Sequence, residues 1–163
     1  MINTYNLFAV PVVHEKFIVP TNIHQKVLNF IDKNYSTFEI KTSCVNGFQT
    51  HDNFDGKEEL NKELNVYLKN NLRLTINSGW LNVLGNNSYN IPHKHGGNDV
   101  DFAGVLYLSA KNNNITFVKE DSIFELKPKL FDYLVFPHDL IHYVLPEKRN
   151  EKRICYAFNL STL

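Results

Sequence analysis

The chain has 163 residues, with 17 basic and 17 acidic side chains, so its formal net charge is zero at pH 7. A chain of this length is expected to form one domain with its own buried core. The balanced charge gives no overall field to attract nucleic acid or an anionic membrane, and no apolar run approaches the roughly 18 residues of a membrane span. Residues 1–6 lack the features of a signal peptide, so we expect a cytoplasmic protein without membrane contact.

The composition favours a folded protein rich in strands. Hydrophobic residues make up 43% of the chain and aromatic residues 13%, which suits strands packed around a large interior. Two cysteines, Cys44 and Cys155, are too few for a disulfide framework, so we expect both to be reduced and packed in the core.

The first 71 residues or so are expected to support a core formed by the rest. Residues 5–17 are rich in Val and Phe and are interrupted by Pro11, which predicts an edge strand that tolerates a missing amide donor. Residues 36–48 form a mixed stretch that predicts a strand or an extended loop crossing the core.

Two amphipathic helices are predicted in this first part. The first runs to about Asn34, with Thr21 or Asn22 as its N-cap, and the second runs to about Asn70 after a capping box at residues 55–58. Each needs an apolar surface to cover, and the outside of a β-barrel or sandwich provides one. Their apolar stripes are Ile23, Val27, Phe30 and Ile31 in the first helix, and Leu60, Leu64 and Leu68 in the second.

From about residue 72 the pattern changes to short β-rich segments separated by polar turns. Helices do not alternate with these segments, which favours a sandwich, jelly roll or barrel over a parallel sheet. We therefore predict one mainly β domain over residues 1–163, with a support region at about 1–71 and a jelly-roll core at about 72–163. The predicted strands are Leu72–Leu84, Phe102–Ser109, Ile115–Val118, Ser122–Leu126, Tyr133–Phe136, Ile141–Leu145 and Arg153–Leu160.

His93 and His95 are separated by one residue. On an extended segment, alternate side chains point the same way, so both imidazoles can face one point while Lys94 faces outward. This arrangement suits a metal chelate, although imidazole binds iron, zinc, copper and nickel alike.

A third imidazole comes from the segment around residues 134–144. His142 lies in a strand-like run, and we predict that it points into the core with the first two histidines. His138 competes for this role, but it follows Pro137 in a turn, where a solvated position or a supporting one is expected. The alternative for His142 is a core histidine bonded to a backbone carbonyl.

Arg153 begins a predicted strand in which successive side chains point to opposite faces. Its own face carries a cation, small residues and an amide, which is typical of a cavity wall. A buried guanidinium needs an anionic partner, and its fork matches a carboxylate. The alternative is an exposed Arg153 beside Glu151. The two faces are Ile154, Tyr156 and Phe158 on one side, and Arg153, Cys155, Ala157 and Asn159 on the other.

Together these features resemble the 2-oxoglutarate- and Fe(II)-dependent oxygenases, and among them a small prolyl-hydroxylase-like branch of phages and marine bacteria. Their core is a double-stranded β-helix, a form of jelly roll, and the resemblance covers nearly the whole chain. The segments that carry it are Thr42–Thr50, Trp80–Asn82, His93–His95, Ala103–Leu108, Phe136–His142 and Arg153–Asn159.

The resemblance implies roles for individual residues. His93, His95 and His142 would hold Fe(II), and Arg153 would pair with the far carboxylate of 2-oxoglutarate. Further contacts to this cosubstrate are expected from Asn82 and Tyr107 on neighbouring strands, and from Cys155 on the segment of Arg153. Aromatic candidates for the substrate mouth are Trp80, Tyr89, Tyr107 and Tyr143.

Two positions depart from the pattern of the superfamily. His95 stands where that pattern has Asp or Glu, so the iron would have three neutral ligands unless Asp99 or Asp101 provides a carboxylate. Cys155 stands where the superfamily often has Ser, and a thiol is the weaker hydrogen-bonding group.

The implied activity is a dioxygenase that uses Fe(II), 2-oxoglutarate and dioxygen, hydroxylates a peptidyl or amino-acid side chain, and releases succinate and CO2. The expected partners are 2-oxoglutarate and an unidentified substrate, such as a peptide or protein. Two alternatives stay open: a cupin-like three-His metalloenzyme without 2-oxoglutarate, and a jelly-roll binding module without catalysis.

Overall fold

The computed structural model describes residues 3–7, 10–35, 43–50, 53–97, 99–109, 113–148 and 150–163. In chain order the elements are β1 (Asn3–Leu7), β2 (Val10–Lys16), α1 (Thr21–Asn34), β3 (Cys44–Val45), β4 (Phe48–Gln49), α2 (Lys57–Leu72), β5 (Leu74–Leu84), β6 (Tyr89–His93), β7 (Phe102–Tyr107), β8 (Ile115–Lys119), β9 (Ser122–Leu126), β10 (Asp132–Pro137), β11 (Ile141–Val144) and β12 (Arg153–Thr162).

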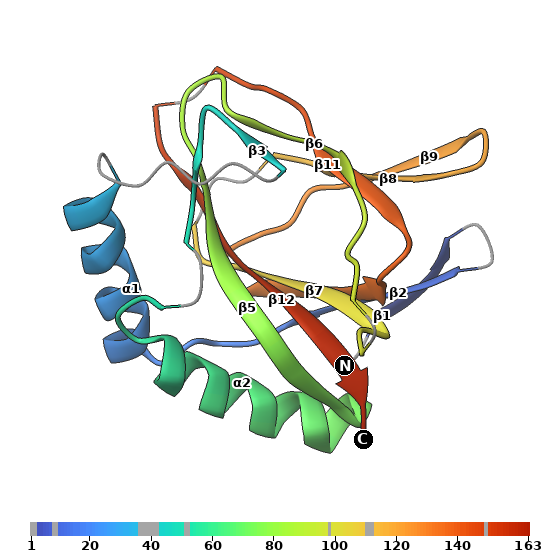
Figure 1. Ribbon diagram of the computed structural model, residues 1–163, viewed down its shortest axis with the longest axis horizontal. Helices are drawn as coiled ribbons and strands as arrows, with labels where there is room; N and C mark the ends of the chain where they lie inside the picture. The colour runs from blue at the N-terminus through green and yellow to red at the C-terminus, as the bar shows by residue number, and fades with distance from the viewer. Residues whose placement is uncertain are drawn as a thin grey trace.

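The strands form two antiparallel sheets, which confirms the predicted mainly β, jelly-roll class of fold. The larger sheet has seven strands in the order β1-β2-β10-β7-β12-β5-β4, and the smaller has five in the order β3-β6-β11-β8-β9. Figure 1 shows the smaller sheet above the larger one, with both helices outside the pair. No helix in the described ranges is long and apolar enough to cross a membrane.

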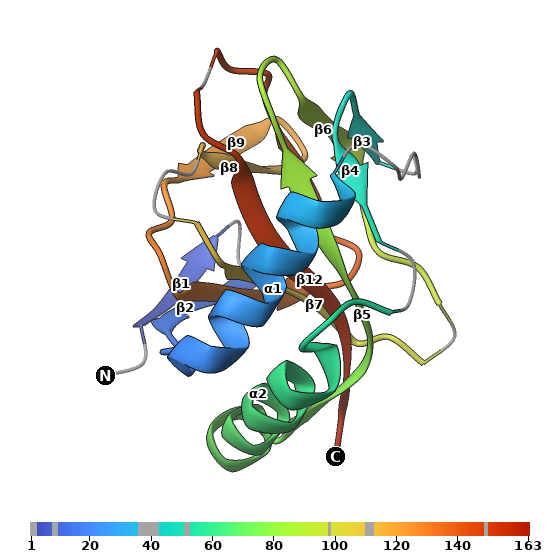
Figure 2. The same cartoon turned by 90° about the vertical axis from the view of Figure 1, so that its left-hand side faces the viewer.

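The helices cover the outer face of the larger sheet, as their predicted stripes require (Figure 2). Leu60, Leu64 and Leu68 of α2 are fully buried in one cluster with residues of α1 and β12. The predicted caps were wrong, because neither helix has a side-chain cap: the N-caps are Pro20 and Gly56. Gly56 has φ +90°, a conformation that favours glycine, and a side chain there would press on α1.

The N-terminal strand prediction was partly wrong. The structure describes two strands there, and β2 lies between β1 and β10 instead of at the edge. Pro11 is tolerated because it pairs only with β1, whereas residues 13–16 pair with β10. Most of the stretch predicted to cross the core, residues 36–42 and with it Thr42, lies outside the described residues, and β3 and β4 follow it.

β12 is an interior strand of the larger sheet and has the predicted alternation. It pairs with β5 on one side and β7 on the other. Ile154, Tyr156 and Phe158 belong to the cluster under the helices, whereas Arg153 and Cys155 line a cavity between the two sheets. The two cysteines are free and buried, as expected.

Two glycines beside β12 leave room for its aromatic rings. Gly104 of β7 lies opposite Phe158, and a methyl group added there would overlap the Phe158 ring. Gly79 of β5 also lies opposite Phe158, and a methyl group added there would overlap the ring of Tyr156. These rings therefore pack directly against backbone.

Gly104→Ala is expected to lower the free energy of unfolding by roughly 1–3 kcal/mol, because the fully buried Phe158 ring cannot move away without displacing the core. Gly96→Ala is the matched control, since an added methyl group there meets nothing within 4 Å. Urea denaturation of both variants measures the difference. Equal stability of the two would contradict the packing described.

Candidate metal centre

Three histidines predicted as ligands meet in space. One ring nitrogen each from His93, His95 and His142 lies within 4.8 Å of the other two, and this is the only such group of His, Cys, Asp or Glu found in the described part of the chain. His93 ends β6 and pairs directly opposite His142 of β11. β6 itself was expected only as an extended segment, and its pairing with β11 is what unites the two rings.

The Nδ1 atom of each ring is held by an oxygen acceptor. His93 bonds the carbonyl oxygen of Ile91 at 2.8 Å, and His142 bonds that of Leu140 at 3.0 Å. Because a carbonyl only accepts, these Nδ1 atoms carry the proton and their Nε2 lone pairs stay available. His95 Nδ1 lies 2.6 Å from Oδ1 of Asn159, which fixes the third ring in the same way.

The surroundings keep the three imidazoles neutral. Burial lowers the pKa of His93, lowers that of His95 to about 4, and lowers that of His142 well below its ordinary value. Neutral imidazole is the form that binds metals. Aromatic rings pack around the group, with Trp80 at 5.5 Å from His95 and Phe136 at 4.8 Å from His142, both measured between ring centroids.

The other candidates for the cluster lie elsewhere. His138 Nδ1 lies 3.1 Å from the backbone oxygen of His95, a supporting position, as expected. Asp101 is exposed, and its carboxylate accepts hydrogen bonds from the backbone and hydroxyl of Thr162. Asp99 is also exposed. Neither carboxylate belongs to the group of close donor atoms.

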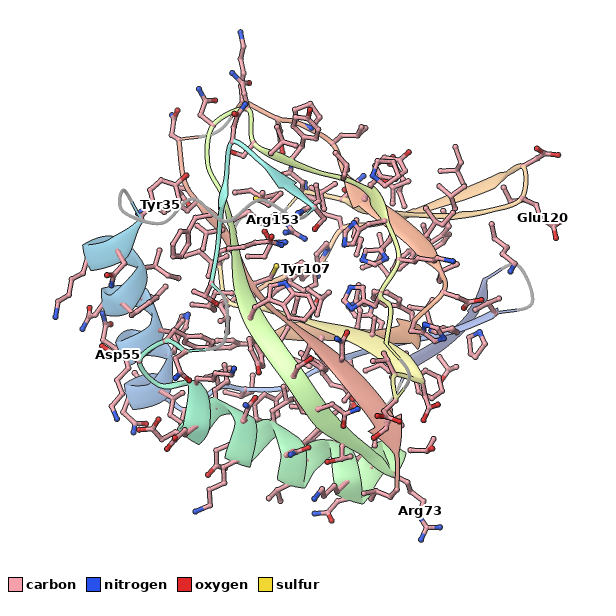
Figure 3. All side chains as sticks on the ribbon, viewed as in Figure 1. Tyr35, Asp55, Arg73, Tyr107, Glu120 and Arg153 are labelled. Atoms are coloured by element: carbon pink, nitrogen blue, oxygen red, sulfur yellow. The ribbon has the colours of Figure 1, made fainter. Side chains whose placement is uncertain are left out.

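Arg153 is only 2% exposed and lies between the sheets. Figure 3 shows its side chain beside that of Tyr107 near the centre of the molecule, whereas Arg73 extends from the periphery. Its guanidinium lies 3.4 Å from Cys155 Sγ and 3.5 Å from the Tyr107 hydroxyl. Burial raises the pKa of both groups, so both are neutral at pH 7. Within the described ranges, the buried cation has no carboxylate partner.

Three buried polar atoms around this cavity have no hydrogen-bond partner among the described residues: Arg153 Nε, Asn82 Oδ1 and Asn90 Nδ2. An unpaired buried polar group costs about 1–3 kcal/mol, so such groups are rare in folded proteins. Their convergence on one cavity indicates a site for a polar ligand. The predicted contact Asn82 lines this cavity, whereas Tyr107 lies beneath Arg153.

The cavity continues into an open pocket. Its inner part, between Arg153 and the histidines, has a volume of about 30 Å³. The outer pocket measures about 360 Å³ and is also lined by Ser43, Trp80, His93 and His95. Of the aromatic residues predicted at the mouth, Trp80 lines both parts and Tyr143 lines the inner one, whereas Tyr89 and Tyr107 line neither.

Sequence reasoning missed Asn90 and Ser43 as lining residues. Asn90 lies three positions before His93, so simple alternation would point the two side chains to opposite faces. The register between β6 and β11 shifts between these positions, which brings both to the same cavity. A proline at position 92 was the available signal for an irregular strand.

The metal-free protein is expected to lose stability as the pH falls below about 6.5, the ordinary histidine pKa, at which the unfolded chain takes up protons. The folded protein takes them up only at lower pH, near 4 for His95. The part of the free energy of unfolding that comes from the lowered histidine pKa values is complete above pH 6.5 and is lost as the pH falls toward 4. Urea denaturation at pH 7.5 and 5.5 measures the loss, which should be smaller in His95→Gln; an equal loss would contradict the expectation.

Comparison with known proteins agrees with the fold described above. No protein-family model and no curated protein matches the sequence. Among solved structures, a Pseudomonas putida prolyl-4-hydroxylase matches with 12% identity over 93% of this chain and 92% of that one, with a TM-score of 0.61. A Trichoplax adhaerens prolyl hydroxylase, in complex with a hypoxia inducible factor peptide, has 11% identity, coverage of 93% and 83%, and a TM-score of 0.68.

HygX from Streptomyces hygroscopicus, solved with nickel, 2-oxoglutarate and hygromycin B, has 11% identity, coverage of 93% and 82%, and a TM-score of 0.64. At these identities the likeness concerns the fold. The structural neighbours of this chain are thus prolyl-hydroxylase-like proteins and 2-oxoglutarate–Fe(II) oxygenases, and the chain has their fold.

Proposed function

We propose that this protein is a 2-oxoglutarate- and Fe(II)-dependent dioxygenase. One observation carries the proposal: the same cavity is lined by three neutral imidazoles and by a buried guanidinium that has no carboxylate partner among the described residues. The first can hold a divalent metal and the second a carboxylate. The fold shared with prolyl hydroxylases and HygX supports the combination.

The donor set fits a divalent iron. His93, His95 and His142 would hold it through Nε2, since each Nδ1 is engaged with an oxygen. Three protein ligands leave positions open for other molecules. When bound, Fe(II) supplies the activation of dioxygen that organic side chains lack.

The lining fits 2-oxoglutarate at the other end of the cavity. Arg153 would pair with its far carboxylate, and Nδ2 of Asn90, which has no acceptor among the described residues, provides another donor nearby. Asn82, Tyr107 and Cys155 would complete this subsite. Because the inner cavity measures only about 30 Å³, binding of a five-carbon dicarboxylate includes an outward movement of the side chains around it.

The protein groups in this proposal bind, orient and exclude water. Phe117 and Phe136 pack against His142 and keep solvent from that side of the metal centre. Arg153 sets the orientation of the dicarboxylate, since it is fixed at the start of β12, opposite Leu84 of β5. The outer pocket, with Trp80 and Lys94 in its lining, is where the substrate would approach.

For the substrate, we propose a peptidyl or amino-acid side chain, hydroxylated with release of succinate and CO2. The support is the fold shared with prolyl hydroxylases, one of them in complex with a peptide. The outer pocket of about 360 Å³ has the size of a small-molecule site and can accept one side chain with its flanking backbone.

One observation favours a second candidate function, a cupin-like three-His metalloenzyme that does not use 2-oxoglutarate. The donor group in the described residues contains no carboxylate, because His95 occupies the position where the superfamily has Asp or Glu. Arg153 distinguishes the two functions, since only the oxygenase needs an anion-binding cation inside the cavity.

Anaerobic addition of Fe(II) and 2-oxoglutarate to the purified protein is expected to give a visible charge-transfer band, and admission of air should yield succinate. His142→Ala should abolish both signals because it removes one of three ligands. His138→Ala is the matched control and should retain them, since its ring contacts only the backbone oxygen of His95 and is not one of the three close donor groups. Absence of both signals in the unaltered protein would rule out the oxygenase assignment.

Arg153→Gln should weaken 2-oxoglutarate binding by roughly a hundredfold, the effect of losing a buried charge-assisted pair. Binding of Mn(II) should persist, because the imidazoles are untouched. Isothermal titration measures both affinities, with Arg73→Gln at the exposed end of α2 as the control. Unchanged 2-oxoglutarate affinity in Arg153→Gln would instead support the three-His alternative.

A further inference from the structure

The outer pocket, over the part of its lining that the structure describes, combines an apolar wall with one charged side chain. Trp80 and Ile91 contribute the apolar surface, and Ile91 is 40% exposed. Lys94 contributes the charge, and no Asp or Glu is among the described lining residues. Ser43 and Asn159 add polar groups that can form hydrogen bonds. A ligand that matches this lining carries an apolar group and a negative charge close together.

Lys94 is fixed at this pocket by its backbone and not by its side chain. The backbone is held on both sides, because β6 ends at His93 and the backbone N–H of His95 donates to the carbonyl oxygen of His138 at 2.8 Å. The side chain is exposed, and no ion pair in the described part of the chain includes it. Its ammonium is therefore available to a molecule that enters the pocket.

The charge of the loaded site also favours an anion in the outer pocket. The two positive charges of a divalent metal and the two negative charges of 2-oxoglutarate would cancel, which leaves Arg153 and Lys94 without a compensating charge from the described lining. A carboxylate at position 95 would reduce this excess, but the neutral imidazole of His95 does not. A cleft lined by charges of one sign concentrates ligands of the opposite sign. The substrate is therefore expected to be negatively charged.

We propose that the substrate carries a carboxylate next to an apolar side chain, and that Lys94 recognises this carboxylate. The proposal rests on the proposed function and specifies the substrate class. An exposed ammonium contributes little affinity but discriminates between charges, so Lys94 determines specificity while Trp80 and Ile91 make the apolar contact. An acidic residue in a peptide and the free α-carboxylate of an amino acid are two sources of the same chemical group.

The test uses acetylated and amidated pentapeptides with proline, leucine or phenylalanine at the centre, flanked by Asp, by its neutral isostere Asn, or by Lys. They are titrated calorimetrically, without air, into the full-length protein loaded with Mn(II) and 2-oxoglutarate. Peptides with Asp should bind roughly tenfold more tightly than those with Asn, at the lower end of the enhancement that electrostatic steering gives. Peptides with Lys should bind most weakly.

The same titration with free proline, leucine and phenylalanine, and with their α-amides, distinguishes the two sources of the carboxylate. Tighter binding of the amino acids than of their amides, with no difference between Asp and Asn peptides, would identify the α-carboxylate. The reverse result would identify an acidic peptide. Addition of Fe(II) and air then measures whether the compounds that bind also raise the rate of succinate formation.

Lys94→Glu should reverse the order, so that peptides with Lys bind more tightly than those with Asp. Lys119→Glu is the matched control, since Lys119 is equally exposed at the end of β8 and lines neither part of the cavity. This variant should keep the order of the unaltered protein. An unchanged order in Lys94→Glu would overturn the role of that residue.

Equal binding of Asp and Asn peptides, together with equal binding of amino acids and amides, would overturn the proposal with the unaltered protein alone. So would the absence of binding by every compound in the panel. If 2-oxoglutarate were still converted to succinate, either result would overturn the substrate class and leave the proposed function standing. Failure of 2-oxoglutarate to bind would overturn the proposed function, and the proposal with it.

Discussion

The antiparallel register of β12 is the constraint on which the rest of the structure depends. This strand is paired on both sides over most of its length, with β5 and with β7. Alternate residues pack under the helices or face the space between the sheets. A slip of one residue would exchange the two faces, placing the guanidinium of Arg153 in the apolar cluster and the ring of Tyr156 in the cavity. Core packing and cavity chemistry are therefore fixed by the same hydrogen bonds.

Burial of polar groups around the cavity works against stability. Arg153, Asn82 and Asn90 each have an atom that makes no hydrogen bond within the part of the chain that the structure describes, and three imidazoles lie side by side in neutral form. Apolar residues in the same place would make the folded state more stable. The helices compensate on the opposite face of the sheet, where Leu60, Leu64 and Leu68 are fully buried against β12 and its neighbours.

Sequence reasoning predicted the features that follow from strand alternation and helical periodicity. The faces of β12 and the apolar stripes of α1 and α2 are properties of single elements, and all three were correct. Sequence reasoning failed where contacts between elements determine the local structure. The predicted caps were wrong, because the N-cap positions are held by Pro20 and by Gly56, whose left-handed backbone lies against α1. Asn90 was missed because its side depends on a register shift between β6 and β11, which no single segment encodes.

The histidines of the cluster differ in what orients them. His93 and His142 each bond the backbone carbonyl two residues earlier, at Ile91 and Leu140, so no substitution of a side chain can remove either acceptor. His95 depends on the carboxamide of Asn159, which comes from a distant part of the sequence. The main chain thus preserves the orientation of His93 and His142 when neighbouring side chains are substituted. The acceptor of His95 can be lost by a substitution at Asn159, and change in the candidate metal centre would be expected to begin there.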